Sequence, residues 1–146
     1  MANFAGANGY ACRNTLRKLS AYDMKHGGLA LAAQTLYQGT MVGLDAAAKT
    51  VRRGGGLIAT FQGGMLGRML SPSKLPAVVT DVVEWEQGIF CWANIGAITL
   101  ASKGAICYAD DDQSVSLTNT NVIAGVIEDV TAEGVWVLMG PDTRVP

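Results

Sequence analysis

Short apolar runs separated by turn-forming residues follow one another through the last third of the chain. The runs are Ile98–Leu100, Ala105–Tyr108, Ser114–Thr118, Val122–Val126 and Val135–Met139. Glycine and aspartate suit the turns between them. Glycine adopts backbone conformations that other residues avoid, and an aspartate carboxylate accepts hydrogen bonds from nearby backbone amides. The pattern therefore predicts an all-β fold, a small antiparallel β-barrel or sandwich built from hairpins.

Two stretches of the chain are similar to each other. Residues 35–51 and 99–115 each contain Thr-Leu, a glycine turn, a short apolar strand, a turn led by aspartate and a returning strand. We expect two similar hairpins there. An internal duplication and a coincidence of shared turn chemistry both explain the similarity.

The apolar pattern also differs between strands. In Ser114–Thr118 only alternate residues are apolar, so we expect one face to meet water. Ile89–Trp92 and Val135–Met139 are apolar on both faces and need a layer on each side. The core supplies one layer. A neighbouring subunit or a loop of the same chain supplies the other.

The chain divides into two regions. Residues 1–28 carry a basic segment and glycines without a sustained apolar face, so we expect an N-terminal arm, extended or partly helical. This arm is either a poorly ordered tail or a segment that orders against a partner. Residues 29–146 form the expected β-domain, with a Gly/Pro-rich loop at about 54–76. Apolar residues at 65, 66, 69 and 70 predict a short helical turn within that loop.

Composition narrows the classes of function. The 146 residues suit one domain, and 49% hydrophobic with 16% charged residues excludes wholesale disorder. No apolar run is long enough to span a bilayer, and the N-terminus does not resemble a signal peptide. We therefore expect no membrane partner. A net charge of −1 argues against nucleic acid as a partner. Many glycines and few charges suggest a surface partly covered by neighbouring subunits.

Candidate reactive residues are few. The single histidine, His26, lies beside two glycines, and we expect it to be solvated. Asp110–Asp112 lacks the ligand spacing of a calcium loop, so we expect a solvated turn. The three cysteines form no metal or redox motif and are expected to be reduced and buried. Packing is expected for the tryptophans, Trp136 in particular. We predict no catalytic residue, no metal, no cofactor and no enzymatic activity.

Positive charge is concentrated in two segments. Such positive charge is typical either of an ordinary solvated surface or of a surface that docks onto an acidic protein. The candidate contact residues, for a shell or for another subunit, are Arg13, Leu16, Arg17, Lys18, Leu19, Arg52, Arg53 and Trp92.

Several short segments resemble tailed-bacteriophage capsid decoration (cement) proteins. They are Gln38–Val42, Gln87–Phe90, Ile98–Tyr108, Asp111–Asp112, Ile123–Val130 and Gly134–Val137. The resemblance implies a structural virion protein, made in the bacterial host cytoplasm and located on the outer capsid surface. It would stabilise the shell by bridging neighbouring major capsid protein subunits. The implied partners are the major capsid protein and the chain itself, as a trimer preferentially or as a dimer.

An alternative is a virion-surface binding module that recognises a carbohydrate or a host receptor. Trp85 or Trp92 would then supply the stacking surface.

Overall fold

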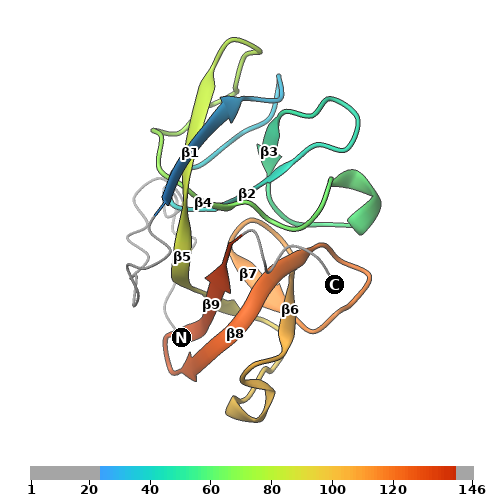
Figure 1. Ribbon diagram of the computed structural model, residues 1–146, viewed down its shortest axis with the longest axis vertical. Helices are drawn as coiled ribbons and strands as arrows, with labels where there is room; N and C mark the ends of the chain where they lie inside the picture. Colours follow the sequence, from blue (N-terminus) through green and yellow to red (C-terminus); the bar gives the residue numbers. More distant parts are fainter. Residues whose placement is uncertain (1–23, 141–146) are drawn as a thin grey trace.

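The computed structural model describes residues 24–140, and these residues form an all-β fold (Figure 1). The fold-class prediction is therefore confirmed. The strands are β1 (Met24–Leu29), β2 (Met41–Leu44), β3 (Val51–Arg53), β4 (Gly67–Met69), β5 (Val82–Asn94), β6 (Ile106–Ala109), β7 (Ser114–Ser116), β8 (Ile123–Thr131) and β9 (Gly134–Met139). Two 3₁₀ turns, η2 (Ile58–Thr60) and η3 (Leu100–Ser102), connect them.

Five strands close into a barrel in the order β5, β7, β6, β8 and β9, with β9 pairing back onto β5. Every pair in this ring is antiparallel except β5–β7, which is parallel. Strand directions cannot alternate all the way round a ring of five, so at least one neighbouring pair must be parallel. Closure pairs the edges of the sheet that would otherwise be exposed.

The remaining strands form what we call the second lobe, which consists of β1 to β4 with the first half of β5. The first half of β5 pairs with β1 on one side and with β4 on the other. β2 joins β4 to β3, and a bridge between Ala30 and Val51 links the end of β1 to β3. Figure 1 shows β5 running through both parts of the molecule.

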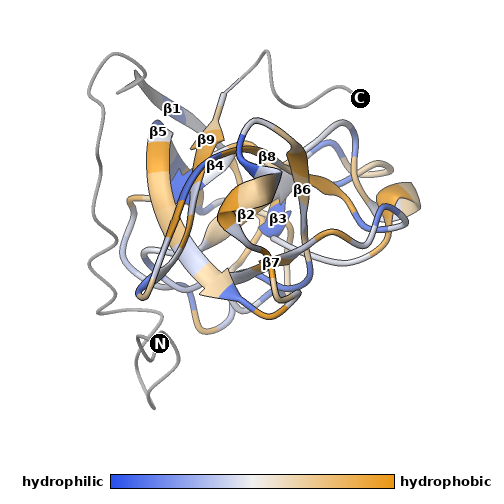
Figure 2. Ribbon diagram, turned by 90° about the horizontal axis from the view of Figure 1, so that it is seen from below, coloured by the Kyte–Doolittle hydropathy of each residue, from blue (hydrophilic) through white to orange (hydrophobic). Residues whose placement is uncertain are grey.

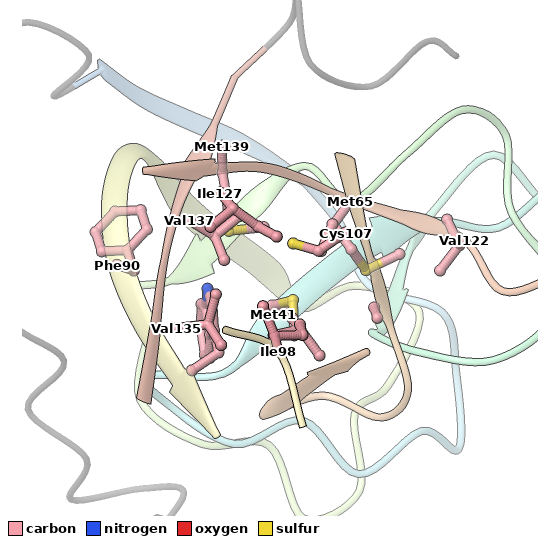
Figure 3. Packing of buried hydrophobic residues seen from close by; sticks show 14 of the residues in the cluster. Met41, Met65, Phe90, Ile98, Cys107, Val122, Ile127, Val135, Val137 and Met139 are labelled. Carbon is pink, nitrogen blue, oxygen red and sulfur yellow. The ribbon is translucent and has the colours of Figure 1, made fainter. Parts of the chain in front are cut away.

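Successive side chains of β5 point to opposite faces of the strand, and these two faces contribute to different hydrophobic cores. Val83 and Trp85 pack in the second lobe, whereas Phe90 and Trp92 pack inside the barrel. Met41 of β2 and Met65 also enter the barrel core (Figure 3). Ile89, Cys91 and Trp136 form a separate buried cluster on the other face of β5 and β9, so both faces of Ile89–Trp92 are buried, as expected. Much of β5 and β9 consists of hydrophobic residues (Figure 2).

The boundary expected for the arm is wrong. Residues 24–28 belong to β1, which pairs in antiparallel register with Val82–Gln87 of β5. The residues of the expected arm that precede Met24 lie outside the described residues.

The expected Gly/Pro-rich loop contains more regular structure than the sequence suggested. Its helical turn lies at η2, not at residues 65–70, where the chain is extended and includes β4. The backbone amides of Leu66 and Met69 donate to carbonyls of Val42 and Thr40, so pairing with the second lobe overrides the helical spacing.

Two other local predictions also fail. Residues 100–102 form the 3₁₀ turn η3 instead of ending a strand. All three residues of β7 are buried, because β7 lies between β5 and β6 in the barrel wall.

Candidate interaction site

The three arginines among residues 24–140 form ion pairs within the chain. Arg52 lies 2.7 Å from an Asp45 carboxylate oxygen, and Arg53 Nε lies 2.9 Å from Asp112 Oδ2. Arg68 pairs with Glu86. Each guanidinium also lies over an aromatic ring, which adds a cation–π contact. Arg52 and Arg53, two of the expected contact residues, thus have acidic partners within the chain, while the Arg53 side chain remains 40% exposed.

The acidic turn at residues 110–112 is only partly solvated, contrary to the prediction. Asp110 and Asp111 are exposed, but the Asp112 side chain is fully buried against Arg53. Burial raises the pKa of Asp112 to about 6, and the Arg53 guanidinium opposes that rise. The second carboxylate oxygen of Asp112 has no hydrogen-bond partner. This ion pair joins the second lobe to the barrel, where the Asp112 carbonyl also accepts from Met41 N at 2.8 Å.

The two hairpins expected from the sequence similarity are present. β2 pairs with β3, and β6 pairs with β7. In the first turn, Asp45 accepts the amides of Ala47 and Ala48; these bonds and Arg52 hold the pKa of Asp45 below its usual range. In the second turn, Asp111 accepts the amide of Gln113 at 2.9 Å. Both turns therefore use the aspartate chemistry that the sequence predicted.

The aromatic candidates are packed inside the fold. Trp92 has no exposed surface, so the expectation that it contacts a shell or another subunit is wrong. Trp136 is 3% exposed and its indole N–H donates to Thr131 Oγ1 at 3.0 Å, which confirms its predicted burial. Trp85 is buried too, stacked against His26 at a centroid distance of 5.8 Å. His26 is thus part of β1 and half-buried instead of solvated.

The described residues offer little reactive chemistry. Cys91 and Cys107 are buried thiols, as predicted, and burial raises the pKa of the Cys107 thiol to about 12. Within residues 24–140, no group of three or more His, Cys, Asp and Glu side chains is placed to hold a metal. The arm candidates Arg13, Leu16, Arg17, Lys18 and Leu19 lie outside this range.

The most distinctive surface is aliphatic, and sequence reasoning missed it. Five side chains that we call the aliphatic patch are each between 50% and 65% exposed: Leu29, Leu75, Val78, Val79 and Val82. Leu29 and Val82 are register partners in the β1–β5 pair. The end of β1 and the start of β5, which carry Leu29 and Val82, lie at the end of the second lobe that points away from the barrel (Figure 1).

A tight turn holds the patch in place. Asp81 N donates to the Val78 carbonyl, and Asp81 Oδ2 accepts from Val78 N. Ala30 N donates to the Asp81 carbonyl at 2.9 Å, which fixes this turn beside the end of β1. The sequence signal was the apolar residues on both sides of Pro76, which Thr80 and Asp81 separate from Val82 and Val83.

No known protein family, curated protein or solved structure matches this chain. Residues 24–140 include no helix long and apolar enough to cross a membrane. The functional argument therefore rests on the residues and surfaces of the chain itself.

Proposed function

We propose that the chain is a structural, non-enzymatic virion protein that binds the outside of an assembled bacteriophage capsid. In this role it is made in the host cytoplasm and bridges neighbouring major capsid protein subunits on the outer surface of the shell. The observation that carries the proposal is the aliphatic patch. Half-exposed aliphatic side chains gathered in neighbouring segments are typical of a protein-binding surface, and these five are half of the large exposed hydrophobics among residues 24–140.

The distribution of charge supports the same interpretation. Among residues 24–140 the three arginines are paired with acidic residues, which leaves the lysines as the cations outside ion pairs in that part of the chain. A surface of this kind favours apolar contact with protein over binding to nucleic acid. The segment-by-segment resemblance to decoration proteins supports the same role.

Stabilisation of a shell by such a protein follows from mass action. A ligand that binds only the assembled particle stabilises that particle over its free subunits. Linking several weak contacts in one oligomer increases avidity without any new contact. The proposed contacts with the shell are the aliphatic patch and an anchoring arm with Arg13, Leu16, Arg17, Lys18 and Leu19.

The decisive experiment is co-sedimentation of the purified chain with capsids, together with its copy ratio to the major capsid protein. We expect a fixed ratio set by the lattice. Deletion of residues 1–23 removes the proposed arm but spares β1, and we expect it to abolish binding while the β-domain stays folded. Unchanged occupancy by the truncated protein would refute the anchoring role of the arm. Absence of binding by the full-length chain would refute the function.

The alternative module for carbohydrate or receptor binding has less support. Its expected stacking residues, Trp85 and Trp92, are buried and cannot present a ring face to a sugar. A change in tryptophan fluorescence on addition of a glycan would favour this alternative.

A further inference from the structure

Strand β1 pairs with another strand along one side only. Ala30 N donates to the Asp81 carbonyl at 2.9 Å, and these two residues continue the β1–β5 register beyond Leu29 and Val82. In an antiparallel pair, residues that bond the partner strand alternate with residues whose N–H and C=O groups point away from it. The residues of β1 whose backbone groups point away from β5 are therefore Lys25, Gly27 and Leu29.

Neighbouring backbone hydrogen bonds agree with this alternation. Leu31, the next residue in the same series, donates its N–H to the Val51 carbonyl of β3 at 2.8 Å. Glu84 is the register partner of Gly27, and its carbonyl accepts from Leu70 N at 2.8 Å, on the side of β5 away from β1. The backbone groups of Gly27 and Glu84 thus point away from each other.

The other strands among residues 24–140 leave no comparable edge. The ring of the barrel is closed, and β2 and β4 each lie between two strands. β3 has an outer edge, but its Val51 carbonyl accepts from Leu31 and its Arg53 N donates to Gln34 Oε1 at 3.1 Å. Gly27, by contrast, is exposed, and the three atoms nearest to the position of a Cβ on it all belong to β5. The free edge of β1 is therefore an accessible row of backbone donors and acceptors.

We propose that an extended segment of the major capsid protein adds a strand to the free edge of β1 when the chain binds the shell. The inference rests on the proposed function and names how that contact is made. Leu29 connects the two, because its backbone groups belong to the free edge and its side chain belongs to the aliphatic patch. Alternate side chains of an added strand lie on the same face of the sheet as Leu29 and Val82. One partner segment thus covers both the edge and part of the patch.

The edge also defines the chemistry of the segment that it takes. From Lys25 to Leu29 it is about 13 Å long, which an extended segment of about five residues covers. Backbone hydrogen bonds supply affinity without regard to sequence, and the side chains on one face supply specificity. We expect an aliphatic residue beside Leu29 and no proline where the segment must donate an N–H to β1.

Amide hydrogen exchange of the full-length chain, measured residue by residue, is the first test. In the free protein the amides of His26 and Gly28 should exchange slowly, because they bond β5. The amides of Gly27 and Leu29 should exchange rapidly. On capsids the amides of Gly27 and Leu29 should slow by at least about tenfold, whereas those of His26 and Gly28 should change less.

A proline at position 27 is the second test. Gly27→Pro removes an N–H that points away from β5, so β1 keeps its bonds to β5 while an added strand loses a donor. Gly27→Ala is the matched control, because a Cβ there lies 3.8 Å from Val82 Cγ1, an ordinary contact, and the N–H remains. In co-sedimentation with capsids, Gly27→Pro should bind at least about tenfold more weakly than wild type, and Gly27→Ala less than about twofold more weakly. Urea unfolding checks that both variants are folded, and the exchange test needs no substitution.

Three results would overturn the inference and leave the proposed function standing. The first is wild type that sediments with capsids while its Gly27 and Leu29 amides exchange as in the free protein. The second is folded Gly27→Pro that binds as tightly as wild type. The third is slow exchange of these amides without capsids, which assigns the edge to a second copy if it requires high protein concentration and to residues 1–23 if it does not. Wild type that does not sediment with capsids refutes the proposed function, and this inference falls with it.

Discussion

Removal of Arg53 should destabilise the protein strongly, and by an amount that depends on pH. Asp112 is fully buried at the junction of the lobes, and Arg53 is its ion-pair partner at 2.9 Å. Arg53→Met keeps most of the aliphatic stem but leaves the carboxylate without a countercharge. Leaving a buried charge without its partner costs up to about 3–5 kcal/mol, and the cost is lower here because the Arg53 side chain is 40% exposed and Asp112 can take up a proton.

The dependence on pH follows from the raised pKa of Asp112. In the folded chain this pKa is about 6, against a model value of 3.8. Between these values the folded state binds more protons than the unfolded state, so this residue's contribution to stability falls as pH rises. At neutral pH, ionised Asp112 costs about 3 kcal/mol relative to an ordinary carboxyl group. Loss of Arg53 raises the pKa of Asp112 further and enlarges this cost.

The assay is urea unfolding of wild type and Arg53→Met at about pH 5 and about pH 7.5. We expect a small difference in unfolding free energy at the lower pH, where Asp112 is protonated in the variant. At the higher pH the difference should reach about 2 kcal/mol, because pH 7.5 lies about 1.5 units above the wild-type pKa of about 6 and the variant can keep Asp112 protonated. In an Asp112→Asn background, Arg53→Met should lose most of this dependence. An equal effect at both pH values in the wild-type background would refute the argument.

Three further outcomes are expected. Trp136→Ala should lower the unfolding free energy by roughly 3–5 kcal/mol in urea, because the ring is 3% exposed; a loss below about 0.5 kcal/mol would place it on open surface. Gly55→Ala should destabilise the fold by more than Gly63→Ala, by about 1–3 kcal/mol, because both glycines have positive φ but a Cβ at Gly55 alone would overlap the Asp111 backbone. Peptide mapping after thiol alkylation at about pH 8 should find Cys107 unmodified in the native protein and modified in urea; equal labelling in both would contradict its burial and raised pKa.

The hairpins could be predicted because their signals are local. The aspartate-led turns at Asp45 and Asp111 depend on residues within three positions, and the structure shows these bonds. The strand Gly134–Met139 also follows from its own composition. The prediction of local conformation failed where hydrogen bonds to distant strands determine that conformation. The chain around Met69 is extended because of its bonds to the second lobe, although its apolar spacing suits a helix.

The residues predicted to contact a shell or another subunit show more clearly that local sequence patterns do not reveal long-range contacts. Arg52, Arg53 and Trp92 have the composition of an interaction surface, yet the first two are paired with acidic residues and the third is in the core. Arg53 and Asp112 are 59 residues apart in the chain, so no local pattern could reveal their pairing. The aliphatic patch was missed for the converse reason. An apolar run predicts a buried segment, and only the fold shows that one side of this run has no neighbouring element.

By itself, the sequence determined the all-β class, the positions of the hairpins and the burial of Trp136, Cys91 and Cys107. These follow from residue types and short spacings. Only the tertiary structure decided that β5 serves two cores, that Arg53 is paired with Asp112 and that Leu75, Val78, Val79 and Val82 are left exposed. Burial and ion pairing depend on which distant segments meet, as Arg53 of the second lobe and Asp112 of the barrel do.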